Sequence, residues 1–296
     1  MLDSKQCEAF IAVIQTGSFD KASKKLYLTP SAITSRINAL EHHVGNLLVQ
    51  RGKTCMATHQ GTLLLNHLQQ AHLLEANLLK TLQQPLHHDF YKITIAANAD
   101  SLATWLLPVL KQPLIDNQII VEILVDDQSQ TSNLMLSGLA NACLSIESKA
   151  MKGCEAVYLG KMRYQLRCTV PFFNKWFGDN PTREHYRSAP AVIFNDKDYL
   201  HFDFMEQHFG LSKGSYPYHI IPSSESFVTA IYYGLGYGLI PDLQLANHTD
   251  SRAFKYLAPQ FYIDVPLYWH YWQNQSAMLA ELTAQIIKAT QSVLVR

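Results

Sequence analysis

Residues 18–41, SFDKASKKLYLTPSAITSRINALE, predict two short helices joined by a tight turn. Ser18 is suited to cap a first helix over Phe19–Leu26, because a serine hydroxyl accepts a hydrogen bond from a free helical N–H. Thr29 is placed to cap the second helix, and Pro30 follows at its first position, where a missing N–H is tolerated. Apolar residues at helical spacing form one seam that holds the pair together: Ala22, Leu26, Ile33, Ile37 and Leu40.

The second helix carries short polar side chains outside this seam, at Ser31, Thr34, Ser35, Arg36 and Asn38. Donors and acceptors of this size suit base edges and phosphates in the major groove of DNA. The same pattern also fits an ordinary helical hairpin with a polar outer face. The residues on either side therefore decide between the two interpretations.

The flanking sequence predicts the remaining parts of a winged helix-turn-helix. Lys5–Gln15 has apolar residues at helical spacing and predicts a preceding helix. After the pair, Leu47–Arg51 and Cys55–Ala57 predict two short strands joined by a turn. The cations Arg51 and Lys53 sit at the tip of this wing, where they suit contact with DNA phosphates or the minor groove.

A long helix is predicted from a cap at Thr58 to about Leu82. Its apolar residues recur at 3.5-residue spacing, with Glu75 as an interruption, at Leu64, Leu68, Ala71, Leu78 and Leu82. A stripe this narrow favours pairing with a second copy of the helix, and packing against the chain's own body is the alternative. Pro85 and the polar run His87–Asp89 indicate the linker that follows.

From residue 91 the sequence alternates between strands and helices, which indicates an α/β domain. The first five segments begin a doubly wound parallel sheet: Lys92–Ala97, Leu102–Leu110, Ile119–Val125, Leu134–Gly138 and Ala142–Ile146. A strand over 162–170 is expected to cross into a second lobe, with inward side chains at Met162, Tyr164, Leu166, Cys168 and Val170. The second lobe contains Ala191–Phe194 and Tyr218–Ile221, and the chain returns through Val265–Trp272 and the helix Ser276–Val293. Two lobes joined by two crossings leave a ligand cleft between them.

Composition and charge fit a DNA-binding head on a larger body. The chain has 296 residues, 48% of them hydrophobic and 16% charged, enough for two or three folded domains. Residues 1–82 carry a net charge of +3 and the remainder −3, as expected for a nucleic-acid-binding module attached to another domain.

No apolar run reaches the roughly 18 residues of a membrane span, and no secretory signal is visible. The five cysteines lack CxxC spacing, so we expect buried, reduced thiols in a cytoplasmic protein.

Two segments have the character of an anion site in the cleft. Asn98–Ser101 lies between a strand and a helix, where free N–H groups and the helix dipole favour a carboxylate, and Ser223–Glu225 repeats that arrangement in the second lobe. Carboxylates without a neighbouring arginine or lysine suit a ligand that brings its own cations, as lysine and arginine do. They are Asp100, Asp126, Asp127 and Glu225. A solvated strand end at Asp126–Asp127 and a simple helix cap at Asp100 are the alternatives.

Other chemistry has little support in the sequence. Adjacent histidines such as His42–His43 point apart, and His201 and His208 share a helix face without further ligands at zinc spacing. There is no GxSxG nucleophile motif, and GLGYG at 234–238 predicts a turn into a strand rather than a nucleotide loop. We therefore expect no metal, no cofactor and no catalytic residues.

The whole chain resembles the LysR-type transcriptional regulators. The first 82 residues are similar to their winged helix-turn-helix and leucine-rich linker helix, through AFIAVIQTGSFDKASKKLYLTPSAITSRINALE (9–41) and LLVQRGKTCMATHQG (47–61). The remainder looks like their two-lobed effector domain, which is related in fold to periplasmic binding proteins. Three segments are similar to the lysine- and arginine-responsive ArgP/LysG branch: NADSLATWLLPVL (98–110), SSESFV (223–228) and LYWH (267–270).

The resemblance implies an order of domains. Residues 1–58 correspond to the winged helix-turn-helix domain, 59–90 to a dimerisation linker helix and hinge, and 91–296 to the effector-binding domain. Within the effector-binding domain, lobe I takes residues 91–163 and 264–296, and lobe II takes residues 164–263.

The resemblance also implies a function. Such a protein is a cytoplasmic homodimer or homotetramer that binds double-stranded promoter DNA, senses lysine or arginine, and controls genes of amino-acid export or metabolism. Ligand closes the lobes and re-spaces the DNA-reading heads, which changes DNA bending and the access of RNA polymerase. A solute-binding protein and an enzyme on the same two-lobed scaffold are the alternatives.

The family pattern assigns residues to each site. DNA binding is expected at Ser18, Thr29, Pro30, Ser31, Thr34, Ser35, Arg36, Asn38, Arg51 and Lys53. Pro30 and Ser35 stand where the family often has glutamine and arginine, so the operator is expected to differ from those of relatives. Effector binding is expected at Asn98, Ala99, Asp100, Ser101, Asp126, Asp127, Ser145, Ser223, Ser224 and Glu225.

Overall fold

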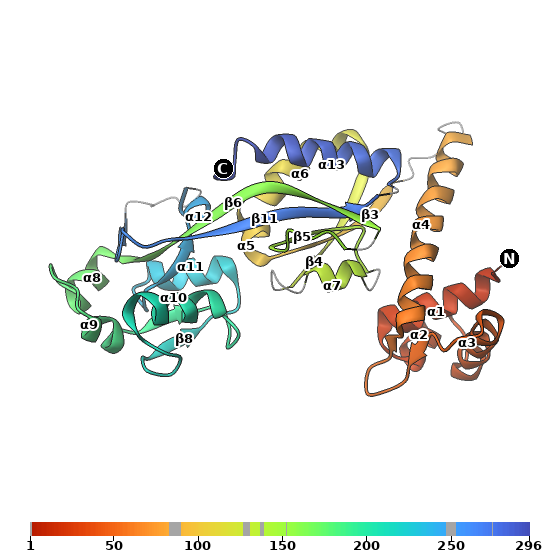
Figure 1. Cartoon of the computed structure of the whole chain (residues 1–296), viewed down its shortest axis with the longest axis horizontal. Helices are drawn as coiled ribbons and strands as arrows, with labels where there is room; N and C mark the ends of the chain where they lie inside the picture. The colour runs from red at the N-terminus through yellow and green to blue at the C-terminus, as the bar shows by residue number, and fades with distance from the viewer. Residues whose placement is uncertain are drawn as a thin grey trace.

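The computed structural model of the chain has an N-terminal helical head, a long helix and a body of two α/β lobes (Figure 1). It describes residues 2–82, 90–126, 131–136, 139–151, 153–246, 253–273 and 275–296. Within those residues no helix combines the length and the hydropathy needed to cross a membrane.

The head contains the predicted pair of helices together with the helix before them and the wing after them. Its elements are α1 (Ser4–Thr16), α2 (Phe19–Lys25), α3 (Pro30–Val44), and the antiparallel strands β1 (Val49–Gln50) and β2 (Met56–Ala57). The hydroxyl of Ser18 accepts from the N–H of Lys21, and that of Thr29 from the N–H of Ala32, so both predicted caps are confirmed. Tyr27, at φ 55°, makes the tight turn between the helices.

The predicted apolar seam forms the core of the head. Ala22, Ile33, Ile37 and Leu40 are fully buried, and Leu26 packs against them in part. Phe10 and Val13 of α1 complete this core. Three short helices thus enclose one apolar centre and leave the opposite face of α3 to solvent.

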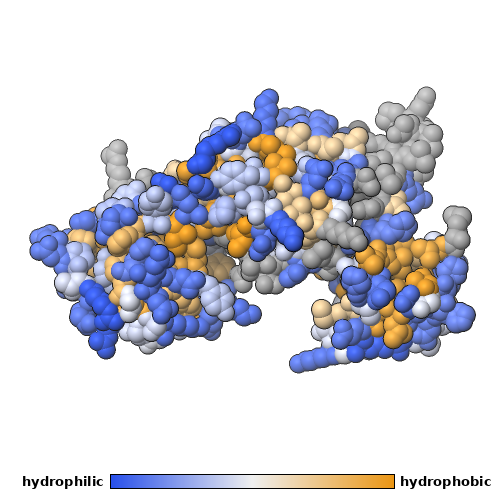
Figure 2. Space-filling model, viewed as in Figure 1, coloured by the Kyte–Doolittle hydropathy of each residue, from blue (hydrophilic) through white to orange (hydrophobic). Residues whose placement is uncertain are grey.

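The long helix α4 (His59–Leu82) begins as predicted, with Thr58 accepting a hydrogen bond from the N–H of Gly61. Leu64 and Leu68 pack in part against the apolar core of the head. The first turns of α4 therefore pack within the chain itself. Leu63 is 53% exposed, and hydrophobic residues appear on the visible face of the head beside this helix (Figure 2). The side chains of Leu78 and Leu82 lie outside the described residues, and dimerisation through α4 stays a prediction.

The predicted start of the α/β body is confirmed, but the sheet is mixed rather than parallel. β3 (Tyr91–Ala97) pairs in parallel with β4 (Ile119–Val125) and with β5 (Ala142–Ser145). β11 (Ile263–Trp272) then enters between β5 and β6 (Cys154–Thr169) and runs antiparallel to both. The strand order is β10-β6-β11-β5-β3-β4, with β9 also on β6. The expectation of a doubly wound parallel sheet is therefore right for three strands and wrong for the rest.

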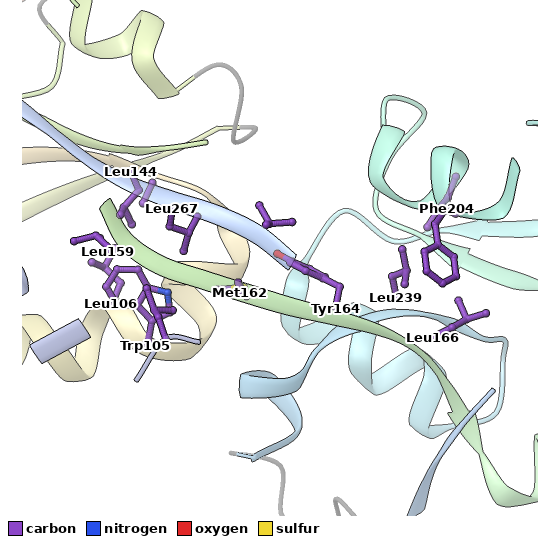
Figure 3. Packing of buried hydrophobic residues seen from close by; sticks show 14 of the residues in the cluster. Trp105, Leu106, Leu144, Leu159, Met162, Tyr164, Leu166, Phe204, Leu239 and Leu267 are labelled. Atoms are coloured by element: carbon purple, nitrogen blue, oxygen red, sulfur yellow. The ribbon is translucent and has the colours of Figure 1, made fainter. Parts of the chain in front are cut away.

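Lobe I covers its sheet with helices. A single helical stretch follows β3 and comprises α5 (Ala99–Ser101), a π-helical turn η1 (Leu102–Leu106) and α6 (Leu107–Asp116), so it is longer than predicted. The other helices are α7 (Thr131–Leu136), which begins three residues before the predicted start at Leu134, and α13 (Ala277–Thr290). Residues 137–138 of the predicted span lie outside the described part. Trp105 of the π-helical turn is 2% exposed and packs with Leu106, Leu144 and Leu159 (Figure 3).

Lobe II is built from short elements around the far end of β6. They are α8 (Val170–Trp176), α9 (Arg183–Ser188), β7 (Ala191–Ile193), α10 (Tyr199–Phe209), β8 (Tyr218–Ile220), α11 (Ser224–Tyr232), β9 (Gly238–Pro241), α12 (Asp242–Ala246) and β10 (Phe254–Tyr256). β7 and β8 pair in parallel, and GLGYG leads into β9 as predicted. A side chain at Gly236 would lie 2.8 Å from the carbonyl oxygen of Pro190, so this backbone approaches its neighbour too closely for any other residue.

The strand β6 crosses from one lobe to the other, as predicted, but it has 16 residues and begins eight residues before the predicted start at Met162. Met162, Tyr164, Leu166 and Cys168 are at most 2% exposed, and three of them line one face of the strand from lobe I to lobe II (Figure 3). Val170 is 43% exposed and begins α8 instead, so its inward placement was wrong. Pro171 follows it and has no N–H to donate to a sheet ladder, which ends the strand.

A bulge interrupts β6 where it leaves lobe I. The register with β11 shifts between Leu267 and Tyr268, and Gly160 has a φ of +139°. Beside it, Lys161 and Val295 exchange two backbone hydrogen bonds of 2.6 and 3.0 Å. A Cβ at Gly160 would lie 2.6 Å from Cβ of Leu294, which is itself buried. Only glycine fits both the backbone conformation and the space.

Two features of the core bear on pH and redox behaviour. His201 on α10 is 1% exposed, its ring lies 6.0 Å from that of Tyr216 and 6.3 Å from that of Tyr237, and neither ring nitrogen has a hydrogen-bond partner within the described part of the chain. Burial lowers the pKa of His201 to about 3, so the folded protein holds it neutral. All five cysteines are free and buried, as expected.

Gly160→Ala should lower the free energy of unfolding by about 2–5 kcal/mol, because the new methyl group adds a clash to an unfavourable backbone angle. Gly178→Ala is the matched control, since Gly178 also has a positive φ, +61°, and nothing within 4 Å of an added Cβ. Urea unfolding followed by tryptophan fluorescence measures both. Equal losses in the two variants would show that residues 294–295 do not pack against the bulge.

The buried neutral histidine should make the protein less stable in acid. Between about pH 7 and about pH 5 the unfolded chain binds a proton at His201 and the folded chain does not, so the free energy of unfolding falls by about 2 kcal/mol. His201→Leu should remove this part of the loss, while His219→Leu on the exposed edge strand β8 should leave it. Thermal unfolding midpoints at the two pH values measure the difference, and parallel pH profiles for His201→Leu and the unmutated chain would contradict it.

Candidate functional site

The exposed face of α3 carries some, but not all, of the residues expected to bind DNA. Ser31, Ser35 and Asn38 are exposed and lie opposite the buried seam. Thr34 is half-buried, and its hydroxyl donates to the carbonyl of Pro30 at 2.9 Å. The remaining α3 candidate, Arg36, is half-buried and two residues from Asn38, so the two side chains point to nearly opposite sides of the helix. Ser18 and Thr29 serve as helix caps.

The two wing cations differ in position. Lys53 is exposed in the turn between β1 and β2, at the tip of the wing as expected. Arg51 is folded back against the helices instead: its Nη2 donates to Oδ1 of Asn38 at 2.9 Å, and its guanidinium carbon lies 5.2 Å from the ring centroid of Phe19. The expected placement of Arg51 at the wing tip is therefore wrong. The hydrogen bond to Asn38 and the contact with the ring of Phe19 stabilise the guanidinium of Arg51 more than full exposure to solvent would.

The loop into the wing is fixed by a carboxylate at the end of α3. Oε1 of Glu41 accepts from the N–H groups of Leu48 and Val49 at 2.7 and 3.1 Å. Because Leu48 and Val49 are buried, this bond sets how β1 leaves the helical pair. Hydrogen bonds from Glu41 and Asn38 thus join the wing and Arg51 to α3.

A cavity of about 920 Å³ lies between the two lobes of the body. Lobe I contributes Asn98, Ala99 and Asp100 from the start of the helical stretch after β3, and Asp126 from the end of β4. Lobe II contributes Ser224 at the start of α11, so five of the residues predicted for an effector line one space. Its volume is in the range that encloses a small molecule.

Asp100 joins the two lobes at this cavity. Its Oδ1 accepts from the hydroxyl of Ser224 at 2.6 Å, and its Oδ2 accepts from the hydroxyl of Tyr164 at 2.7 Å. Gln244 of α12 donates in turn to the hydroxyl and the carbonyl of Ser224 at 3.0 and 2.8 Å. Burial raises the pKa of Asp100, and the bonds from Ser224 and Tyr164 oppose that change. Residues 124 positions apart in the sequence are thus in direct contact.

Unpartnered polar atoms gather at the lobe I wall of the cavity. Asn98 is 4% exposed and caps the helical stretch without a side-chain cap bond, and both its amide nitrogen and its amide oxygen lack partners within the described residues. Ser101, a predicted effector residue that does not line the cavity, has a fully buried hydroxyl that lacks a partner within the described residues as well. Buried donors and acceptors in native proteins are almost always paired, so this wall has the character of a ligand site.

The cavity lining is acidic. Among the described residues that line it, the charged side chains are those of Asp100, Asp126, Asp198, Asp264 and Lys197. Asp264 is paired with Arg163 at 2.7 and 2.9 Å, and this partner lowers its pKa. Asp198 accepts from the backbone N–H groups of Phe194 and His201 at the start of α10. An excess of carboxylates over cations favours a positively charged ligand.

Several residues predicted for this site lie away from the cavity lining. Ser223 caps α11 by accepting from the N–H of Ser226, Glu225 is exposed, and Ser145 accepts from the N–H of Glu147. Asp127 lies outside the described residues. The start of α11 therefore presents Ser224 to the cavity and turns its neighbours to solvent.

The loop between β7 and α10 and the first turn of α10 also line the cavity, although no residue there was predicted for the site. Asn195, Lys197, Asp198, Tyr199 and His201 line the lobe II side of the cavity, together with Gln244 of α12. The signal was present, because Asn195–Asp198 follows a predicted strand and opens a helix, as Asn98–Ser101 does. The lysine in this loop, Lys197, adds a cation that was not predicted at the site.

Comparison with known proteins identifies the family. Residues 4–62 match the family described as "Bacterial regulatory helix-turn-helix protein, lysR family". The HTH-type transcriptional regulator ArgP of Aeromonas salmonicida is 36% identical over 286 residues, which cover 97% of this chain and 96% of that protein.

Two solved structures are similar over the full length. The crystal structure of ArgP from Mycobacterium tuberculosis has a TM-score of 0.84 at 34% identity, covering 100% of this chain and 99% of that one. Full-length LysG from Corynebacterium glutamicum with bound effector Arg has a TM-score of 0.78 at 31% identity, covering 99% and 100%. With the helix-turn-helix head, the two-lobed body and relatives of this similarity over the full length, the chain belongs to the LysR family of bacterial helix-turn-helix transcriptional regulators.

Proposed function

We propose that this regulator binds promoter DNA through its head and responds to a basic amino acid, arginine or lysine, bound between its lobes. The contact of Asp100 with Ser224 across an acidic cavity carries the proposal, because it brings both predicted halves of the site together. The arginine bound to LysG of C. glutamicum, which is 31% identical, supports the same ligand class. Relatives are named as transcriptional regulators, which disfavours the solute-binding and enzyme alternatives.

The cavity supports one orientation of such a ligand. The α-carboxylate would lie at the start of the helical stretch Ala99–Asp116, near the unpartnered amide of Asn98, because helix N-termini offer free N–H donors. The side-chain cation would face Asp126, at the end of β4. Charge-assisted hydrogen bonds from a guanidinium or an ammonium to a carboxylate are stronger than neutral ones. Closure of the lobes on this ligand would re-space the heads and alter RNA polymerase access.

The head supports DNA binding by α3 and the wing. The exposed face with Ser31, Ser35 and Asn38 suits the major groove, and Arg51 and Lys53 suit phosphates on either side. A head with a net charge of +3 binds DNA more tightly when two copies are paired, because more phosphates are neutralised. This supports a homodimer or homotetramer assembled through α4. We place the regulator in the cytoplasm, acting on genes of amino-acid export or metabolism.

Removing one phosphate contact should reduce the salt dependence of DNA binding. Arg51→Ala should weaken binding to every duplex and lower the slope of log K against log salt concentration by about 0.9. Lys288→Ala, which removes one exposed charge from α13 in lobe I, is the matched control and should change neither. Fluorescence anisotropy with a labelled mixed-sequence duplex over a salt series measures both quantities. An unchanged affinity and slope for Arg51→Ala would refute its role at a phosphate.

Calorimetric titration of the full chain should give binding heat with arginine or lysine and much less with citrulline, which replaces the guanidinium of arginine by an uncharged group. Asp126→Asn should weaken binding of the basic amino acid at least about ten-fold, because a charged hydrogen bond contributes roughly 1.5–3 kcal/mol. Asp203→Asn on the exposed side of α10 is the control and should bind normally. No heat with either basic amino acid would reject the effector class and leave the DNA-binding role standing.

A further inference from the structure

Arg51 is held in place before any DNA is bound. The wing places it at the end of β1, and it reaches back across the head to two helices. Asn38, in the middle of α3, accepts from its Nη2 at 2.9 Å, and Phe19, the first residue of α2, offers its ring face at 5.2 Å. Three elements of the head therefore fix one guanidinium beside the exposed face of the recognition helix.

The same contact limits what Asn38 can recognise. An asparagine reads adenine with both ends of its amide: the oxygen accepts from N6 and the nitrogen donates to N7. In this head one of the two lone pairs on the oxygen of Asn38 accepts from Arg51, and one lone pair and the two N–H groups of the amide remain. An adenine would have to share this oxygen with the guanidinium of Arg51.

We propose that Asn38 is a positioning residue that acts on DNA through Arg51. It fixes the guanidinium so that the remaining N–H groups form a fork for one phosphate beside the groove that α3 enters, and it reads no adenine itself. The proposal rests on the phosphate role of Arg51 in the proposed function and adds the residue that sets its geometry.

The gain from this arrangement is entropic. A free arginine side chain loses rotamer entropy when it binds a phosphate, because its long chain has many accessible conformations. Arg51 has given up part of that freedom in the folded head, because Asn38 and Phe19 hold it from two sides. The phosphate then meets a preformed donor pair, which lowers the free-energy cost of binding without adding any contact to a base.

A double-mutant cycle tests the proposal in the full-length chain. The variants are Asn38→Ala, Arg51→Ala and the double variant, and the probes are a mixed-sequence duplex and a duplex selected by the unmutated chain from a random library. Asn38→Ala should weaken binding to both duplexes by the same factor, about two- to ten-fold, which is the net contribution of one hydrogen bond. In the Arg51→Ala background it should have no further effect.

Ser35→Ala is the matched control, because Ser35 is exposed on the same face of α3, one turn before Asn38. Its effect should be the same with and without Arg51. Unchanged thermal unfolding midpoints establish that the variants fold, as expected for exposed positions.

Each other outcome has a definite meaning. A loss confined to the selected duplex would identify Asn38 as a base reader and overturn the proposal, and so would a full Asn38→Ala effect in the Arg51→Ala background. If Arg51→Ala binds both duplexes as the unmutated chain does, the phosphate role fails and this inference fails with it. If only Asn38→Ala is without effect, the phosphate role stands and the positioning role is rejected.

Discussion

The pairing of β6 with β11 is the constraint on which the body depends. Ten residues of β11 pair with β6 through lobe I and past its bulge. β6 then pairs with β9 and β10 in lobe II, while β11 pairs with β5 in lobe I. The ribbon also reaches the cavity, to which it contributes Tyr164 and residues 263–266. Neither lobe has a complete sheet without the β6–β11 pair. The hydrogen bonds that link Asp100 to Ser224 between the lobes also reach this pair, through Tyr164 of β6.

The sequence predicts the head better than the body, and the reason is physical. Caps such as Ser18 and Thr29 and the seam of α3 depend on residues within one or two helical turns, so local patterns determine them. The sheet depends on pairing between distant strands: nothing local at Val265–Trp272 shows that this strand enters between β5 and β6 and runs antiparallel to both. The prediction of an inward side chain at Val170 was wrong for a local reason, because Pro171 ends the strand although the alternation of apolar residues reaches Val170.

The site was predictable where it follows a rule of topology. Asn98–Asp100, Asp126 and Ser224 meet because strand ends and helix starts of facing lobes open onto the same cleft. Lys197 obeys that rule too, but its loop carries no motif that distinguishes it from a solvent-exposed turn. Arg51 illustrates a different limit. Its charge favours DNA, yet only the folded head brings Asn38 and Phe19 within reach of its guanidinium.

The burial of all five cysteines makes the chain convenient for labelling. Burial raises the pKa of Cys143 and Cys168 to about 12 and that of Cys154 to about 11, so at neutral pH these groups are unreactive thiols as well as shielded ones. A cysteine introduced at an exposed position in each lobe would therefore react with a maleimide dye in preference to the native ones. Energy transfer between two such dyes would report the distance between the labelled positions on the two lobes in an otherwise unaltered regulator, bound to DNA or free.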